Sequence, residues 1–324
     1  MKLESIIKPI KDDLDTFDKY FKSQLQSKVP LLNMVLRYVA SRSGKKMRPA
    51  LIFLTSKLFG ELNQRAIIGA TMVELLHTAT LVHDDVVDEA QERRGFLSIN
   101  AIWKNKVAVL LGDYLLSRGL LVSVENEEFE FLKVTSNAVK KMSEGELLSM
   151  EASRRMNYSM ETYFEIIRNK TAVLLRSCCE IGAISQNQPK EVIDDMGKFG
   201  ELLGIAFQIK DDILDYTTNS TLLGKPVGND IKEKKITLPL IFALENSSQI
   251  EVDNILKKMK SSKSAKKEVQ NIIDFVKFKN GIDFAEQKAK DFIDNAIGIL
   301  KKYPDNDAKN SLINFSLYII EREK

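Results

Sequence analysis

Apolar residues recur at helical spacing along almost the whole chain, with charged residues on the intervening positions. Only seven prolines and fifteen glycines interrupt the pattern, and no alternating strand pattern flanked by turn pairs stands out. The pattern predicts an all-α fold, and one domain over residues 1–324, because no Pro-rich or Gly/Ser-rich linker divides the chain. The predicted helices span residues 10–27, 31–42, 50–59, 63–89, 106–124, 128–154, 160–168, 170–186, 190–216, 237–246, 251–260, 265–279, 282–302 and 307–321.

Two of the long predicted helices end in the same acidic pattern, DDxxD. The carboxylates are Asp84, Asp85 and Asp88 in the first copy and Asp211, Asp212 and Asp215 in the second. On a helix, the first and last members of each copy lie one turn apart on one face. The helix dipole disfavours anions at a C-terminal end, so cations must offset the cost. One copy alone is better explained by a solvated helix end.

Two copies together predict a shared task, which is to hold divalent cations over a polyanionic ligand. Mg²⁺ suits this arrangement because it is usually held by one or two carboxylates together with substrate phosphates and waters. The repeated acidic pattern therefore predicts diphosphate chemistry.

Basic residues gather around the acidic pattern in the sequence. Arg93 and Arg94 follow the first copy, and paired guanidinium groups can bind phosphate oxygens in a bidentate manner. Lys45 and Arg48 lie in a loop before Pro49, where we expect a second anion site. His77 lies two helical turns before Asp84 on the same face. Each of these residues alone is equally explained as a surface charge or an ordinary helix histidine.

The overall composition is that of a soluble protein without a strong charge bias. The 48 basic and 45 acidic residues leave a net charge of +3, which by itself indicates neither nucleic acid nor membrane as a partner. Cys178 and Cys179 are neighbours in an apolar run, so we expect inert core thiols in a reduced, cytoplasmic setting. The N-terminus has no signal-peptide apolar core, and no run of about 18 uncharged apolar residues predicts a membrane span. The basic stretch 257–267 is explained by a solvated helix pair or, alternatively, by a membrane-surface patch.

Several motifs in order make the chain resemble the trans-prenyltransferases, the head-to-tail isoprenyl diphosphate synthases. The motifs are GKKMRP at 44–49, ELLHTATLVHDDVVDEAQERRG at 74–95, GDYLL at 112–116, KTAVLL at 170–175, FQIKDDILD at 207–215 and GKPVGNDIKEKKITLP at 224–239. The resemblance implies a helical bundle of the isoprenoid synthase type around a central active-site cavity, usually as a homodimer.

The resemblance also implies roles for single residues. The six aspartates of the acidic pattern would bind about three Mg²⁺ ions together with the allylic diphosphate. Further contacts to that diphosphate would come from Arg93, Lys170, Lys225 and Lys235. The metal-free pocket for isopentenyl diphosphate would consist of Lys45, Arg48, His77 and Arg94. Thr171 and Gln208 match positions near the allylic cation, which forms when the diphosphate leaves and is attacked by the isopentenyl double bond.

The length of the product depends on the residues that lead into Asp84. Ala79 and Thr80 stand where short-chain members of the family often carry bulky aromatic side chains, and the next layers are Leu76, Val73 and Met72. Each helical turn adds about 5.4 Å of depth, similar to one isoprene unit. These small side chains predict an open tunnel and a product of about thirty to fifty carbons, as for a respiratory quinone tail. A bulky residue from another helix would instead close the tunnel at about twenty carbons, giving a short-chain synthase.

Three other functions are compatible with parts of the pattern. A terpene cyclase ionises the same substrates but lacks an isopentenyl site and usually a second DDxxD. A non-catalytic regulatory subunit of a heteromeric synthase would usually have lost one acidic motif, and both are intact here. A calcium-binding helical module needs no basic pocket.

Overall fold

The computed structural model describes residues 3–41, 44–93, 95–156, 158–217, 228–261 and 266–322. In these ranges α-helices dominate, and the only strands are β1 (Glu92–Arg93) and β2 (Phe96–Leu97), which form a two-residue antiparallel pair. The all-α fold predicted from the sequence is confirmed.

The helices follow the predicted segments closely. In chain order they are α1 (Leu3–Ile6), the 3₁₀ turn η1 (Lys8–Ile10), α2 (Lys11–Gln24), α3 (Pro30–Ala40), α4 (Met47–Lys57), α5 (Gln64–Val87), α6 (Ile99–Glu125), α7 (Phe129–Arg155), α8 (Met160–Ile167), the π-helical turn η2 (Arg168–Ala172), α9 (Val173–Ser185), α10 (Lys190–Thr217), α12 (Asn229–Lys232), α13 (Leu238–Glu245), α14 (Gln249–Ser261), α15 (Lys266–Phe278), α16 (Gly281–Leu300) and α17 (Asp307–Glu321).

The largest difference from the predicted boundaries is the start of α6. This helix begins at Ile99 rather than at residue 106, because the Ser98 side chain caps it by accepting a hydrogen bond from the Ala101 N–H at 3.3 Å. Lys104, with φ 71° and ψ 164°, then interrupts the helical geometry. Pro49 lies in the first turn of α4, as expected, although that helix already begins at Met47.

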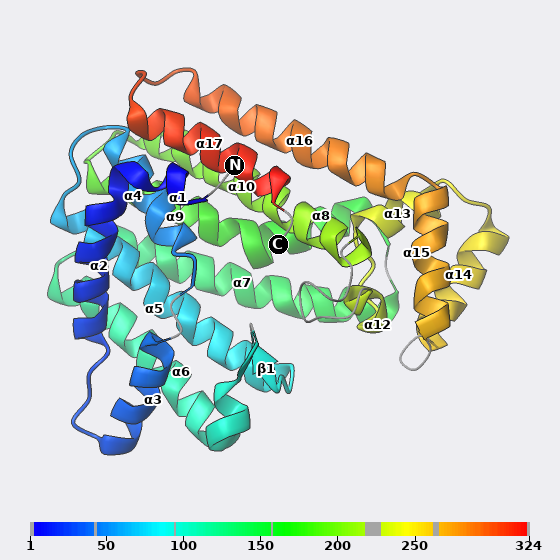
Figure 1. Cartoon of the computed structure of the whole chain (residues 1–324), viewed down its shortest axis with the longest axis horizontal. Coiled ribbons are helices and arrows are strands. Elements are labelled where there is room, and N and C mark those ends of the chain that lie inside the picture. The colour runs from blue at the N-terminus through cyan, green and yellow to red at the C-terminus, as the bar shows by residue number, and fades with distance from the viewer. Residues whose placement is uncertain are drawn as a thin grey trace.

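The long helices stack in layers across the molecule (Figure 1). In that view α6 and α5 lie in the lower part, α7 and α9 cross the middle, and α10, α17 and α16 follow above. The pair α14 and α15 projects at the right-hand end. The C-terminal end of α17 lies over α10, so the last described residues reach the middle of the bundle.

The main hydrophobic core is centred on α5. Its side chains from Ala66 to Val82 are largely buried between the neighbouring helices, as expected for a helix that is apolar on all sides. Its first turn is capped by Asn63, whose side chain accepts a hydrogen bond from the Ala66 N–H at 3.1 Å. Cys178 and Cys179 are both buried in this core as free thiols, and burial raises the pKa of each.

Two helices, α5 and α6, are long and apolar enough to cross a membrane by length and composition alone. The apolar window of α5 is 67% buried inside the fold, whereas that of α6 is only 39% buried. The core helix of a globular bundle passes the same test, which accounts for α5. In the single chain, α6 leaves much of its apolar surface uncovered.

Candidate active site

The first acidic cluster lies at the C-terminal end of α5. Asp84 is half-buried, Asp85 is buried, and Asp88 is the exposed C-cap residue whose N–H donates to the Asp84 carbonyl at 2.8 Å. The last turn of α5 holds no basic residue, and the carboxylates lie at the negative end of the helix dipole, which disfavours anions. A bound cation would relieve this unfavourable placement.

The second acidic cluster lies at the C-terminal end of α10, and its outer two carboxylates are held by a guanidinium group and by backbone N–H groups. Arg322 donates to the Asp211 carboxylate from the C-terminal end of the chain. The backbone N–H groups of Asn229 and Asp230 donate to the two oxygens of Asp215 at 3.0 and 3.1 Å. These contacts fix the outer two carboxylates of the cluster by elements that come after α10 in the sequence.

A chain of hydrogen bonds orients the central carboxylate of the second cluster. Thr171 Oγ1 donates to Gln208 Oε1 at 2.8 Å, and Gln208 Nε2 donates to Asp212 Oδ1 at 2.9 Å. Tyr163 Oη donates to the other oxygen, Asp212 Oδ2, at 2.6 Å. Two of the sequence-predicted site residues, Thr171 and Gln208, are thus connected to a predicted metal ligand.

Burial and mutual repulsion make the second cluster electrostatically strained. Burial, followed by the nearby Asp230, raises the pKa of Asp212 well above its ordinary value. Burial also raises the pKa of Asp215. For Asp230 itself, burial and the neighbouring Asp215 raise the pKa to about 6. Several acids held this close favour a cation between them.

Lys235 connects the two acidic clusters. Burial acts to lower the pKa of this ammonium group, but the carboxylates of Glu233, Asp230 and Asp88 outweigh burial and raise the pKa. Asp88 belongs to the first cluster and Asp230 lies beside the second, so both clusters act on the same side chain. We therefore expect the two DDxxD helix ends to face one site.

Lys170 lies in a π-helical turn between α8 and α9, a distortion that is often found at functional sites. Glycines allow the neighbouring helices to approach this turn closely. A Cβ atom at Gly145 of α7 would lie 2.9 Å from the backbone nitrogen of Lys170. A Cβ atom at Gly204 of α10 would lie 2.4 Å from the Cα atom of Ala172. The Lys170 ammonium group forms an ion pair with Glu146 of α7.

The basic residues predicted to bind isopentenyl diphosphate are brought together only in part. Arg48 Nη1 lies 3.4 Å from Glu74 Oε1, one helical turn from His77 on α5. Arg48 Nε is buried without a hydrogen-bond partner among the described residues, as would suit an anion that binds there. Lys45 is exposed on the segment that enters α4. Arg94 and Lys225 lie outside the described residues, and Arg93 belongs to β1.

A small apolar cavity of about 10 Å³ lies below the first acidic cluster. It is lined by Val73, Leu76, His77 and Thr80 of α5, Thr135, Val139 and Met142 of α7, and Leu174 of α9. None of these lining residues, all from the described part of the chain, is Phe, Tyr or Trp. Ala79 is buried in the core of α5 rather than in this lining.

Three residues of the site were not identified from the sequence: Tyr163, Asp230 and Arg322. Tyr163 and Arg322 reach the second cluster from α8 and from the end of α17, across 49 and 111 residues. Asp230 lies in the quoted GKPVGND motif, but nothing in the motif alone shows that its carboxyl group is buried beside Asp215.

The carboxylates of the two clusters fit a divalent metal ion whose coordination shell is completed by oxygens of a bound ligand. Among the described residues, no three His, Cys, Asp or Glu side chains converge closely enough to hold a metal ion by themselves. Mg²⁺ does not require this, because it is usually bound by one or two carboxylates and takes its other oxygens from phosphates and water. Two carboxylate clusters that share one site match this mode of binding.

Comparisons with known proteins identify the family and the fold. A family model described as polyprenyl synthetase matches residues 29–275. The all-trans-nonaprenyl-diphosphate synthase (geranyl-diphosphate specific) of Rhodobacter capsulatus is 34% identical over 320 residues, 98% of either chain. A polyprenyl synthase of Caulobacter crescentus CB15, solved in complex with calcium and isoprenyl diphosphate, is 30% identical with a TM-score of 0.92 over 100% of this chain and 98% of that one. A geranylgeranyl pyrophosphate synthase of Bacteroides thetaiotaomicron is 35% identical with a TM-score of 0.84 over 98% and 99%.

Proposed function

The chain belongs to the polyprenyl synthetase family, and from this premise we propose that it joins isopentenyl diphosphate head-to-tail, in a 1′-4 linkage, to an allylic diphosphate. The product would be a long-chain all-trans polyprenyl diphosphate, as used for a respiratory quinone side chain. The observation that carries this proposal is the shared site of two DDxxD helix ends, linked through Lys235, next to an apolar cavity. One residue range, 1–324, would form the single synthase domain.

The six DDxxD aspartates would hold about three Mg²⁺ ions, which neutralise the charge of the leaving diphosphate when bound. The calcium and isoprenyl diphosphate in the related Caulobacter crescentus structure support a divalent metal here. The chain itself orients the carboxylates, since Asp212 is held by Tyr163 and Gln208 and Asp215 by two backbone N–H groups.

The basic residues would bind the two diphosphates on opposite sides of the reacting carbons. Arg93, Lys170, Lys225 and Lys235 would contact the allylic diphosphate. Lys45, Arg48, His77 and Arg94 would hold isopentenyl diphosphate without metal, and the unpartnered Arg48 Nε supports an anion there. Thr171 and Gln208 would lie near the allylic carbons, with their oxygens fixed by the hydrogen-bond chain to Asp212. Fixed placement of both substrates is the main contribution of such a site to the rate.

The lining of the small cavity below the first cluster supports a long product, because it contains no Phe, Tyr or Trp side chain that would block the growing chain. Thr80, Leu76 and Val73 lie on successive turns of α5 along it, each turn adding about 5.4 Å. The growing chain would extend along these side chains, with Ala79 leaving room behind them. The likeness to a geranylgeranyl pyrophosphate synthase favours the second candidate, a short-chain product of about twenty carbons.

A homodimer would cover the exposed apolar face of α6. Leu110, Leu121 and Val124 are 67%, 49% and 49% exposed and recur at helical spacing on one side of this helix. A second copy packed on this face would form an isologous interface. We propose a homodimer in the cytoplasm, with at most peripheral contact to a membrane.

Substitution of one aspartate in each cluster tests the proposed function. Asp84→Ala and Asp211→Ala are each expected to lower turnover of isopentenyl and farnesyl diphosphate by orders of magnitude while the helical circular dichroism remains intact. Asp294→Ala, an exposed acid on α16, serves as the control and should retain full activity. Full activity in either cluster variant would contradict the metal-binding role.

A further inference from the structure

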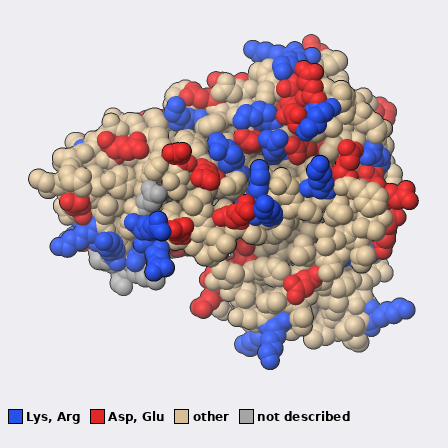
Figure 2. All heavy atoms as spheres, turned by 180° about the vertical axis from the view of Figure 1, so that it is seen from behind, with Lys and Arg blue, Asp and Glu red and all other residues tan. Residues whose placement is uncertain are grey.

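The α14–α15 hairpin has a larger net positive charge than the chain as a whole. Residues 249–279 contain eight lysines and four acidic residues, a net charge of +4, whereas the whole chain has +3, so the other residues sum to −1. The lysines of the described part concentrate near the free end of the hairpin: Lys257, Lys258, Lys260, Lys266 and Lys267. Figure 2 shows the hairpin projecting at the left, with basic side chains gathered at its lower end.

The inner faces of both helices pack into one small core, which leaves the opposite face of each helix exposed. Val252, Ile255 and Met259 of α14 and Val269, Ile272, Ile273 and Val276 of α15 are buried in a single cluster. The positions on the opposite side of each helix, about half a turn away from these buried residues, face solvent. The hairpin thus presents a two-helix outer surface that the rest of the chain does not cover.

Two large apolar side chains stand at the base of this outer surface. Ile250 is 82% exposed and Phe278 is 81% exposed, the highest values for large apolar residues in the described part of the chain. They lie near the start of α14 and at the end of α15, opposite the lysine-rich end. Lys277 and Lys279 flank Phe278, and Lys279 forms an ion pair with Glu251 at 3.0 Å.

We propose that the outer surface of the α14–α15 hairpin docks on an anionic lipid surface. Lysines are attracted to a membrane surface of negative charge, and clusters of four to eight are typical of such contacts. Exposed Phe and Ile side chains add apolar burial at the lipid interface, which a nucleic-acid backbone would not offer. Asp253 and Asp274 lie between the two ends, so we expect the lysine-rich end and the apolar base to make the contact.

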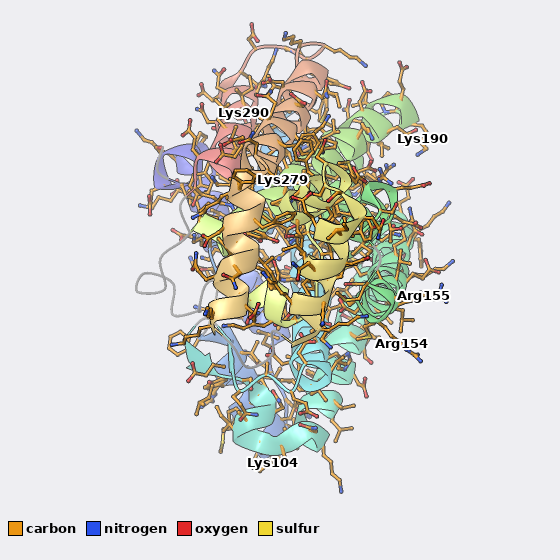
Figure 3. The ribbon with its side chains drawn as sticks, turned by 90° about the vertical axis from the view of Figure 1, so that its right-hand side faces the viewer. Lys104, Arg154, Arg155, Lys190, Lys279 and Lys290 are labelled. Carbon is orange, nitrogen blue, oxygen red and sulfur yellow. The ribbon has the colours of Figure 1, made fainter. Side chains whose placement is uncertain are left out.

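Basic residues of α7 extend the same surface. Met156, which follows Arg155, packs against the core of the hairpin. In the end-on view of Figure 3, Arg154 and Arg155 appear at the edge of the molecule beside the hairpin, with Lys279 at its upper end. The positive surface therefore spans the end of the molecule rather than one helix alone.

The hairpin is attached directly to the second acidic cluster. The Gly228 N–H donates to the Asp215 carbonyl at 3.0 Å, and a Cβ atom at Gly228 would lie 2.3 Å from Val269 Cγ1 of α15. Tyr216, the residue after Asp215, is buried in the hairpin core. Docking through the hairpin would thus bring the site next to the lipid. The proposed product is a poorly soluble lipid, so release next to a membrane would be an advantage if the proposed function is correct. The docking of the hairpin on lipid does not depend on that function.

Vesicle co-sedimentation tests the docking independently of turnover. The full-length protein should bind vesicles of phosphatidylcholine with about one third phosphatidylglycerol, and bind pure phosphatidylcholine at least tenfold more weakly. Lys257→Glu/Lys260→Glu/Lys267→Glu should lower binding to the anionic vesicles at least tenfold, and Ile250→Ser/Phe278→Ser should lower it several-fold. The matched control, Lys133→Glu/Lys290→Glu/Lys301→Glu, reverses three exposed lysines elsewhere and should leave binding within twofold.

Prenyl transfer in detergent keeps this test separate from the proposed function. All variants should retain wild-type turnover there, because none of the substituted residues contacts the site. Vesicle binding that is equal in the hairpin and control variants would overturn the proposal. So would hairpin-dependent binding to single-stranded RNA that is as tight as to anionic vesicles. Absence of prenyl transfer by the wild-type protein would instead refute the proposed function, and the vesicle-binding result would still apply.

Discussion

Arg322 Nη2 donates a hydrogen bond to Asp211 Oδ1 at 2.5 Å, which joins the end of the chain to the second acidic cluster. The same nitrogen donates to the Phe207 carbonyl at 3.0 Å, and the guanidinium carbon lies 3.8 Å from the centre of the Phe207 ring. The Arg322 side chain is only 9% exposed. A buried cation thus already offsets part of the repulsion among these carboxylates.

Arg322→Gln removes this cation from beside Asp211. We expect the protein in EDTA to lose about 1–2 kcal/mol of unfolding free energy, since Asp211 is 42% exposed and solvent screens the pair. Magnesium should then raise the melting temperature more in the variant than in the wild type, because the metal replaces the missing charge. Thermal unfolding with and without Mg²⁺ measures both effects, with Arg322→Lys as the charge-conserving control. Identical unfolding of the Gln variant and the wild type would show that the contact is neutral.

Tyr163→Phe removes the 2.6 Å hydrogen bond to the buried Asp212 carboxylate. That bond acts against the high pKa of Asp212 by favouring its ionised form, so its loss should weaken metal binding. We expect the Mg²⁺ concentration for half-maximal activity to rise about tenfold, corresponding to about 1.4 kcal/mol. Magnesium titrations of the rate should show this shift, whereas Tyr158→Phe, in the turn before α8, should leave it unchanged. An unchanged requirement in the Tyr163 variant would limit that hydroxyl to a packing role.

Asp230 makes the metal-free protein sensitive to pH. Burial, followed by Asp215, raises the pKa of its carboxyl group to about 6. A carboxyl group with a raised folded-state pKa stabilises the fold fully only below its unfolded pKa near 4, and that stabilisation is lost as the pH rises through 6. In EDTA, Asp230→Asn should therefore gain stability over the wild type by about 1 kcal/mol more at pH 7.5 than at pH 5.0. Urea unfolding at the two pH values measures this difference, and an equal effect at both would contradict the raised pKa.

The cavity beside α5 predicts product length through two opposite substitutions. Thr80→Phe places a ring among the lining residues and should shorten the product to about four isoprene units. Phe131 lies one turn before the lining residue Thr135 on α7 and packs with Ile181 against Gly69, one turn below Val73. Phe131→Ala should lengthen the product, at a stability cost of about 3–5 kcal/mol because this ring is fully buried. Mass spectrometry of the products reports both shifts.

An aromatic substitution outside the lining is the control for this pair. Leu110→Phe, on the exposed face of α6, should leave the product distribution unchanged. Wild-type product length in both cavity variants would exclude this cavity as the path of the growing chain.

Lys104 has a backbone conformation that is found almost exclusively at glycine, with φ 71° and ψ 164°. Its side chain points away from the molecule at the bottom of Figure 3. Lys104→Gly relieves the backbone strain without removing a packed side chain, so we expect a gain of about 1 kcal/mol in urea unfolding. Lys106→Gly, two residues further along, should instead cost about 1 kcal/mol in helix stability. A loss of stability in the Lys104 variant would argue against the strain.

Local patterns predicted most of the fold. The long apolar segment before Asp84 gave α5 to within two residues at each end, because the cap at Asn63 and the acidic end of the segment are both visible in the sequence. The start of α6 was predicted at residue 106 rather than at Ile99. The short helical segment that Ser98 caps is interrupted at Lys104, so it is too short to show a helical pattern of its own. The π-helical turn at Lys170 was also missed, since it depends on close approach at Gly145 and Gly204.

The candidate site was predicted where its residues belong to a repeated motif. The six DDxxD aspartates, Thr171 and Gln208 were identified from the sequence, although their roles remain predictions. Arg322 and Tyr163 were not identified, because their contacts depend on how α17 and α8 pack against α10. No local pattern signals a contact across 111 residues. The buried state of Asp230 likewise depends on the position of the segment after α10.

The most direct test of the central claim is to incubate the purified protein with Mg²⁺, labelled isopentenyl diphosphate and farnesyl diphosphate, and to measure product length. We predict products of about six to ten isoprene units. Products that stop at about four units would establish prenyl transfer but favour the short-chain alternative. Absence of incorporation with any allylic primer would contradict the proposed function.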